Sequence, residues 1–206
     1  MSSFYSYDPR LGHGLPHDPF NSIVGPRPIG WISTQSKSGV VNLAPYSFFS
    51  AFNYTPPIIG FSSIGRKDTL SNIEETGDFV WNLVTTDLLE PMNQTSAPYS
   101  AEANEFEMAS LAAIPSTQVT PPRVARARVA FECRRTQIIP LKALSGATLD
   151  SWLVLGEVVQ VHIEQTCLKD GLYQTAEVGH ILRGGGPGDY FSICPEQLLV
   201  LHRPKL

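Results

Sequence analysis

Two adjacent cations, Arg66 and Lys67, stand directly before Asp68, where the sequence predicts that a short helix begins. The first N–H groups of a helix have no partner within it, and the helix dipole makes that end positive, so the position attracts anions. Cations beside such a helix start supply what a phosphate group needs. The pattern therefore predicts a phosphate site within residues 61–69, while an exposed basic turn beside a helix remains the alternative.

A second group of residues suits a flat heterocycle. Hydroxyl and amide side chains lie among aromatic ones in the segments 31–34 and 42–49. A planar ring needs apolar faces to lie on and hydrogen-bonding groups at its edges. For any one of these residues, ordinary strand sequence is the better interpretation, so the prediction rests on the whole group.

Other candidate residues predict less. His13 and His17 have a metal-ligand spacing only on a helix, which the glycine and proline between them disfavour, so we expect no metal site. The glycine run 184–188 lacks the Lys-Ser/Thr of a P-loop and the strand and helix of a dinucleotide motif, and we interpret it as a flexible loop. His162 is interpreted as a barrel-wall residue, whereas His180, near the glycine run, is a candidate for a substrate-side role.

Short β-branched and aromatic runs bounded by Pro and Gly predict the strands that position these groups. Residues 29–34 and 40–43 predict a hairpin that turns at Gly39. Residues 57–63 and 79–84 have the same character, and we expect both to be core strands.

Between those core strands, residues 68–77 predict a short helix with Asp68 or Thr69 as its N-cap and Gly77 as its closing residue. A second short helix is predicted to begin near Asn104, because the residue three positions later is a glutamate, as in a capping box. Neither predicted helix is long enough to form a layer of its own.

The remaining elements are strands. Apolar and polar residues alternate at 129–134, which predicts a half-buried strand. A long strand is predicted at 152–164, where one phase carries Leu153, Leu155, Val159, Val161 and Ile163. Strands do not alternate with helices, which disfavours a doubly wound parallel sheet. The sequence therefore predicts a mainly β protein, a closed or split antiparallel barrel with a few short helices.

Composition and charge limit the possible classes of protein. A chain of 206 residues with 42% hydrophobic residues predicts a single domain over 1–206, in which the aperiodic residues 1–28 form an N-terminal arm. A net charge of −4 without basic runs predicts no nucleic-acid partner. The absence of a long apolar stretch and of a leader predicts no membrane association and a cytoplasmic location. Three separated cysteines predict free thiols.

An ordered series of motifs resembles a known family, the flavin reductase-like proteins of the FMN-binding split-barrel group, which includes flavoredoxin. The matching segments are 26–34, 42–49, 56–57, 67–77, 79–84, 92–98, 105–107, 132–134 and 155–163. The resemblance covers about residues 20–190, and the ordered series is more specific than any one motif. The sequence departs from the family's pattern at 178–186, which leaves the role of that loop open.

The resemblance implies a Greek-key split barrel that forms a homodimer and binds FMN without a covalent link, near the subunit interface. The residues that it places around the flavin are Ser33 and Thr34 with, on the adjoining strand, Asn42, Ala44, Ser47 and Phe48. The residues that it places around the ribityl chain and phosphate are Ser62, Arg66, Lys67, Asp68 and Thr69. This assignment agrees with the phosphate site that the basic turn predicts.

The function that follows is an oxidoreductase in which NADH or NADPH reduces FMN, and the flavin passes electrons to a small-molecule or protein acceptor. No catalytic acid or base is expected, because the hydride chemistry belongs to the cofactor. Without a dinucleotide-binding motif, the nicotinamide would stack on the exposed flavin face. The alternative is a flavoredoxin-type electron-transfer module reduced by a protein partner. A flavin oxidase of small amines, as in the pyridoxamine-phosphate oxidases, matches poorly.

Overall fold

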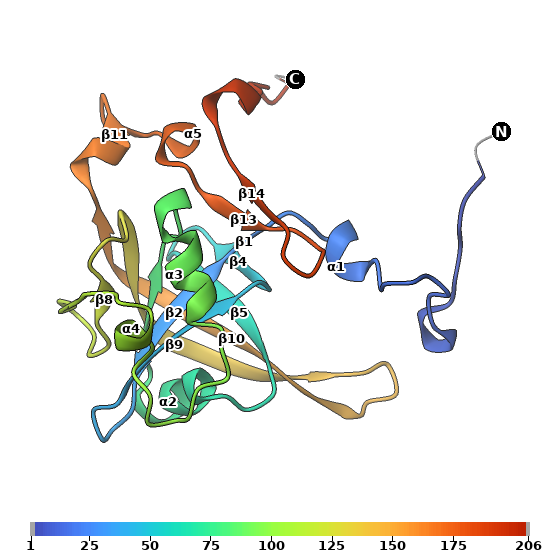
Figure 1. Ribbon diagram of the computed structural model, residues 1–206, viewed down its shortest axis with the longest axis horizontal. Coiled ribbons are helices and arrows are strands. Elements are labelled where there is room, and N and C mark those ends of the chain that lie inside the picture. The colour runs from blue at the N-terminus through green and yellow to red at the C-terminus, as the bar shows by residue number, and fades with distance from the viewer. Residues whose placement is uncertain (1–2, 205–206) are drawn as a thin grey trace.

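The computed structural model describes residues 3–204 (Figure 1). Its centre is a seven-stranded antiparallel sheet in the order β3-β2-β6-β9-β10-β5-β4, curled into a half-barrel. Smaller sheets pair β1-β13-β14, β11-β12 and β7-β8. The mainly β split-barrel fold with a few short helices, predicted from the sequence, is confirmed.

The strands are β1 (Arg27–Pro28), β2 (Gly30–Gln35), β3 (Val41–Tyr46), β4 (Phe49–Asn53), β5 (Ile58–Ile64), β6 (Asp78–Asn82), β7 (Ala113–Ile114), β8 (Arg123–Val124), β9 (Val129–Lys142), β10 (Thr148–Ile163), β11 (Leu168–Lys169), β12 (Leu172–Tyr173), β13 (Ile181–Arg183) and β14 (Tyr190–Ser192). The α-helices are α1 (Phe20–Ile23), α2 (Asp68–Thr76), α3 (Leu89–Gln94), α4 (Glu105–Met108) and α5 (Thr175–Val178). Short 3-10 helices are η1 (Pro9–Leu11), η2 (Thr86–Leu88), η3 (Gln165–Cys167) and η4 (Pro195–Gln197).

Strand β2 is buried on both faces and joins two cores. Successive side chains of a strand point to opposite faces. Ile32 therefore packs into the barrel core with Phe61, whereas Trp31 packs into a second core with Met92 of α3 and Phe106 of α4. The two helices thus cover the outer face of β2 and fix the position of the neighbouring edge strand, β3.

The chain closes the half-barrel between β3 and β4, which lie at opposite edges of the sheet. Only Ser47 and Phe48 separate the end of β3 at Tyr46 from the start of β4, so the two edges must lie close together. The expectation that Ser47 and Phe48 share a strand with Asn42 and Ala44 is therefore wrong. These two residues form the bend by which the chain leaves one edge and joins the other.

Helix α2 follows the basic turn and ends, as predicted, where Gly77 adopts a left-handed φ of 81°. Its N-cap is Lys67, not Asp68 or Thr69, because Lys67 is the last residue with an extended backbone and Asp68 is already helical. No side chain caps the first turn. The first N–H groups of α2 are consequently open to an external acceptor.

The long strand predicted at 152–164 is present as β10, which pairs with β9 along most of its length. Its buried positions are Val154, Gly156 and Val158, and these alternate with the apolar phase visible in the sequence. A Cβ at Gly156 would lie 2.3 Å from the Phe79 ring, so the inner face accepts only small residues there. The apolar phase lies on the outer, half-exposed face instead.

The N-terminal arm leaves the body of the protein at β1, which pairs with β13 (Figure 1). From residue 3 to α1 the arm is almost entirely exposed. Within residues 3–204, no helix is long and apolar enough to cross a membrane.

The glycine run is a loop, as the sequence predicted, and its flexibility stays a prediction. It forms the turn between β13 and β14, with the Arg183 guanidinium at its centre: Nη1 donates to the Asp189 carbonyl at 2.7 Å, and Nη2 to the Gly186 carbonyl at 2.8 Å. The Asp189 carboxylate accepts the Gly186 N–H at 3.0 Å. These contacts give residues 184–189, which we call the glycine turn, a defined shape.

Candidate functional site

Five of the predicted site residues line one groove of about 440 Å³ beside β3 and the start of α2. They are Asn42, Ala44, Arg66, Lys67 and Asp68. The other lining residues are Pro45, Tyr46, Thr95, Ser96, Ala97, Pro98, Tyr99 and Glu105. The structure thus unites the two groups that the sequence predicted separately, the heterocycle-binding strand and the phosphate turn.

A buried polar network lies beneath the groove. The Asn42 amide donates to the Thr69 hydroxyl at 2.8 Å and to the Thr34 hydroxyl at 3.3 Å, and the Asn72 amide donates to Thr34 at 3.1 Å. The Asn42 amide oxygen has no partner among the described residues. Because the network holds Asn42 in place, this oxygen is a fixed acceptor for a ligand N–H or hydroxyl.

Lys67 brings positive charge to the end of the groove at the open N-terminus of α2. Within residues 3–204, no carboxylate lies within 4.0 Å of its ammonium. Asp68, at the first helical position, is the one acid of the turn and stabilises the helix through its dipole. An uncompensated cation beside open N–H groups is the arrangement that an anion requires.

Arg66 differs from its neighbour because it already has a partner. Its Nη1 donates to Glu74 Oε1 at 3.1 Å, a second contact joins Nη2 to Oε2, and the guanidinium lies 5.8 Å from the centre of the Trp152 ring. The sequence predicted two open cations at this turn. In the structure, only Lys67 is open.

Glu105 is a groove residue that the sequence prediction missed. Its side chain is buried, and Oε2 accepts the Leu43 N–H at 3.1 Å. Burial raises the pKa of Glu105, and the neighbouring Asp68 carboxylate adds to the rise. Residues 105–107 are among the segments that resemble the family, but the capping pattern there predicts only the start of a helix and no role for Glu105.

Tyr46 is the second missed residue. Its hydroxyl is buried near Thr69 and Ser63 but has no hydrogen bond of normal geometry within residues 3–204. Burial raises the pKa of Tyr46 to about 12, so the hydroxyl stays a donor. An unsatisfied buried hydroxyl costs about 1–3 kcal/mol, which structures tolerate where a ligand binds. In the sequence, Tyr46 is one of several aromatic residues in the segment 42–49, and nothing in that pattern indicates its buried hydroxyl.

Ser47, Phe48 and Ser62 do not line the groove, and of the three only Ser47 lines a second hollow. Ser47 lines this hollow of about 250 Å³, whose wall shares Pro45, Tyr46 and Ser96 with the groove. The Ser62 N–H donates to the Phe48 carbonyl at 2.8 Å. These three residues therefore lie next to the groove, and their part in flavin binding stays a prediction.

Ser33 and Thr34 point to opposite faces of β2. Thr34 belongs to the polar network under the groove, whereas the Ser33 hydroxyl donates to the Pro122 carbonyl at 2.5 Å. Ser33 thus holds the connector that precedes β8. Its predicted contact with the flavin also stays a prediction.

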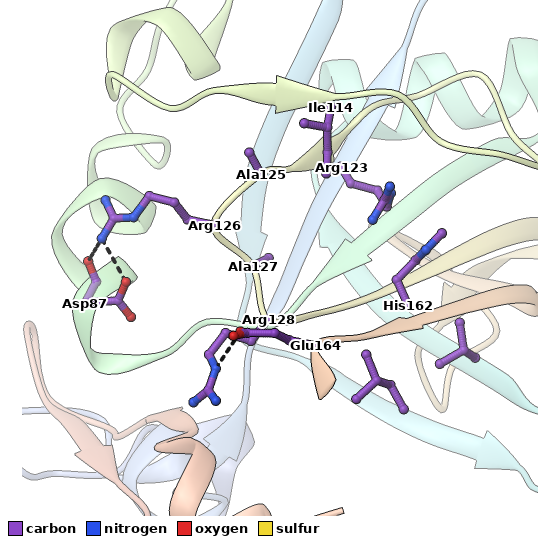
Figure 2. A pocket seen from close by; sticks show the side chains of 11 residues that line it. Asp87, Ile114, Arg123, Ala125, Arg126, Ala127, Arg128, His162 and Glu164 are labelled. Carbon is purple, nitrogen blue, oxygen red and sulfur yellow. Dashed lines mark hydrogen bonds and ion pairs between the residues drawn. The ribbon is translucent and has the colours of Figure 1, made fainter. Parts of the chain in front are cut away.

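Another hollow, of about 840 Å³, contains none of the predicted flavin-site residues. We call it the arginine hollow (Figure 2); its lining residues are Asp87, Ile114, Arg123, Ala125, Arg126, Ala127, Arg128, Val161, His162, Ile163 and Glu164. Arg126 pairs with Asp87 at 2.8 Å, and Arg128 pairs with Glu164 at 2.9 Å (Figure 2). Arg123, the third arginine of the hollow, has no carboxylate partner among the described residues; its Nη2 donates to the Pro115 carbonyl at 3.2 Å, and its buried Nε has no hydrogen bond.

Behind the arginine hollow, Glu132 fixes the connector 115–122. Its fully buried carboxylate accepts the N–H groups of Thr117 at 2.8 Å and Gln118 at 2.6 Å, and it lies 2.6 Å from His162 Nε2. Burial alone would raise the pKa of Glu132, but these hydrogen bonds outweigh it and lower the pKa to about 2. The pair is a structural clamp, consistent with His162 as a wall residue.

Two further predictions concern histidines and metals. His180 Nε2 lies 2.7 Å from the Tyr173 hydroxyl, burial lowers the pKa of His180, and the residue does not line the groove. In the described part of the chain, no three His, Cys, Asp or Glu side chains are grouped to hold a metal ion.

Comparison with known proteins gives a match to the model of the flavin reductase like domain over residues 25–181. A protein of Aquifex aeolicus (strain VF5), itself uncharacterized, is 38% identical over 155 residues, which span 73% of this chain and 76% of that protein.

Two solved structures share the fold at higher than 25% identity. Nitrilotriacetate monooxygenase component B from Bacillus cereus is 27% identical, with a TM-score of 0.83 and coverage of 100% of both chains. The 2-nitrobenzoate 2-nitroreductase of Pseudomonas fluorescens is 28% identical, with a TM-score of 0.79 and coverage of 90% of this chain and 88% of that one.

Proposed function

Because the chain belongs to the flavin reductase-like family, we propose that it is an oxidoreductase that binds FMN in the groove and uses NADH or NADPH to reduce it. The observation that carries the proposal is the end of the groove, where Lys67 and the uncapped first turn of α2 face the same space. A terminal phosphate is the part of FMN that such an end recognises.

The residues of the groove fit FMN on three counts. Lys67 has no counter-ion in the described chain, so a phosphate dianion would compensate it. The buried Tyr46 hydroxyl lacks a partner beside Thr69, and a ligand oxygen nearby would supply one. The Asn42 amide oxygen is held open as an acceptor for a hydroxyl or a ring N–H.

Bound FMN would supply the hydride and electron chemistry, and the residues of the chain bind and orient it. Lys67 and the N–H groups of α2 hold the phosphate end. Asn42, fixed by Thr34 and Thr69, sets the depth at which the ligand lies on β3. Glu105 lines the same groove and holds β3 through the bond that it accepts from the Leu43 N–H.

We further propose that the protein acts as a homodimer in the cytoplasm. The outer face of β10 supports the dimer, because Val161 and Ile163 remain 44% and 39% exposed. Exposed apolar side chains lie elsewhere on the sheet as well, at Phe52 on β4 and at Ile64, which pairs with Ser151 at the opposite end of β10. Burying such a face against a second copy removes apolar surface from water.

Anaerobic mixing of FMN-loaded protein with NADH or NADPH tests the proposed reaction. We expect NADH or NADPH to reduce the flavin rapidly, so that its visible absorbance is lost. The absorbance should return when an electron acceptor is added and reoxidises the flavin. Bleaching by a reduced electron-transfer protein but by neither nicotinamide would instead support the carrier function. Failure of the protein to bind FMN would contradict both.

A further inference from the structure

The second hollow of about 250 Å³ adjoins the groove and has a different chemical character. It shares Pro45, Tyr46 and Ser96 with the groove wall, so the two spaces are neighbours along β3. Its remaining lining residues are Ile29, Ser47, Met92, Asn93, Arg183, Pro187 and Tyr190. Apolar and aromatic side chains surround a few polar groups and one cation.

Two arginines at this hollow have no acidic partner. Arg183 lines the hollow, and Arg27 lies behind it, only 8% exposed. Arg27 donates to the carbonyls of Asn21, Ser47 and Gly184, and no carboxylate within residues 3–204 lies within 4.0 Å of either guanidinium. Burial lowers the pKa of Arg27, and repulsion from Arg183 lowers it further.

Buried charges in proteins are normally paired. Arg126 and Arg128 in the arginine hollow follow this rule, because each bonds a carboxylate. The pair Arg27 and Arg183 does not, although one of its members is almost completely buried. An anion supplied by a ligand would complete the charge balance.

The glycine turn gives this hollow a defined wall. Arg183 holds the turn by its carbonyls, and the guanidinium lies 5.0 Å from the centre of the Tyr190 ring. Pro187, from the same turn, faces the hollow together with Tyr190. An aromatic ring bound here would contact apolar side chains while its substituent lies near positive charge.

The volume selects a small molecule. A cavity of about 150 Å³ in another protein holds benzene, and drug-sized ligands occupy about 300–1,000 Å³. A space of about 250 Å³ therefore suits one substituted ring. The inner wall of Ile29, Pro45 and Met92 favours an apolar ring over a sugar.

We propose that this hollow is a binding subsite for a small aromatic carboxylate, with Arg183 as its specificity-determining residue and Arg27 as a supporting charge. The proposal rests on the proposed function in one respect: it names the class of molecule received beside the flavin groove. The glycine turn, where the sequence departs from the family's pattern, is the element that builds the subsite.

Calorimetric titration of the FMN-loaded protein with benzoate tests the proposal, with benzamide as the neutral isostere. We expect saturable benzoate binding at least tenfold tighter than that of benzamide. Arg183→Gln should weaken benzoate at least tenfold and leave benzamide unchanged. Arg126→Gln, the same change of charge in the arginine hollow, should alter neither.

Because Arg183 also shapes the glycine turn, a second variant fills the hollow from the opposite wall. Asn93 is exposed on α3 and lines the hollow, so Asn93→Trp should abolish benzoate binding without altering the affinity for FMN. Absence of saturable benzoate binding, equal binding of benzamide, or an equal loss in Arg126→Gln overturns the subsite. FMN binding without benzoate binding overturns the subsite alone, whereas benzoate binding without FMN binding overturns the proposed function alone.

Discussion

The arginine hollow and the flavin groove both carry positive charge, yet they differ in how that charge is satisfied. In the larger, arginine hollow, Arg126 and Arg128 are paired with carboxylates of the same chain. In the smaller groove, Lys67 has no such partner in the described residues. Two of the three arginines of the larger hollow are thus compensated within the chain, with Arg123 as the exception, whereas the open cation of the groove is not.

This difference separates two roles. Residues around the arginine hollow should affect the stability of the fold, since their polar partners belong to the protein itself. Residues around the groove should affect ligand affinity with little change in stability, since their partner is absent until a ligand binds. Substitutions in the two regions should therefore separate effects on stability from effects on ligand affinity.

The largest effect is expected at the clamp behind the arginine hollow. Glu132→Ala leaves the N–H groups of Thr117 and Gln118 without their acceptor and removes the partner of His162. Breaking a buried charged pair of this kind costs about 3–5 kcal/mol of unfolding free energy, which urea denaturation measures. Arg126→Gln is the control, because it removes the exposed pair with Asp87 in the same hollow. It should lower the unfolding free energy by less than about 1 kcal/mol.

Acidification should remove the same stabilisation. The folded-state pKa of Glu132 is about 2, below its ordinary 4.5, so its contribution is fully present above pH 4.5 and is lost as the pH falls toward 2. A shift of this size corresponds to about 3 kcal/mol. Urea melts between pH 6 and pH 2 should show this loss in the parent and a smaller one in Glu132→Gln. An equal loss in both would contradict the clamp.

A smaller effect is expected from Thr69→Val in the groove. The substitution keeps the shape but removes the acceptor of the Asn42 amide and a hydroxyl near the phosphate end. One neutral hydrogen bond is worth about 1 kcal/mol, so FMN affinity should fall about fivefold by fluorescence titration. A loss of a hundredfold would place Thr69, rather than Lys67, at the centre of the site.

The smallest effect should come from the partner of Arg66. Glu74→Gln releases the guanidinium from its pair, which increases the positive charge at the turn. Exposed pairs contribute about 0–1 kcal/mol, so FMN should bind at most about fivefold more tightly. Glu75→Gln, the same change of charge on the next residue, is the matched control. Weaker FMN binding in Glu74→Gln would show that the pair itself positions the phosphate site.

Local patterns predicted much of this architecture. The hairpin of β2 and β3, helix α2 with Gly77, and strand β10 follow from alternation, spacing and turn residues, which act over a few positions. The phase of β10 did not follow, because Gly156 is buried by its contact with Phe79, a residue far away in the sequence. Burial of a face depends on what packs against it, and alternation alone does not show that.

The site was predictable in composition but not in connectivity. The sequence brought Arg66 and Lys67 to one turn, yet the difference between them depends on Glu74, almost two turns along α2, and on Trp152 from another strand. Glu105 reaches the groove only because α4 packs beside β3. Such contacts between distant segments leave no local spacing to detect.

The most direct test of the account is the affinity of Lys67→Ala for FMN and for riboflavin, measured by quenching of flavin fluorescence. A charge-assisted hydrogen bond contributes about 1.5–3 kcal/mol, so FMN should bind about ten- to a hundredfold more weakly. Riboflavin has no phosphate, and its affinity should stay unchanged. Unaltered FMN affinity, or an equal loss for riboflavin, would contradict the assignment of the phosphate site to this turn.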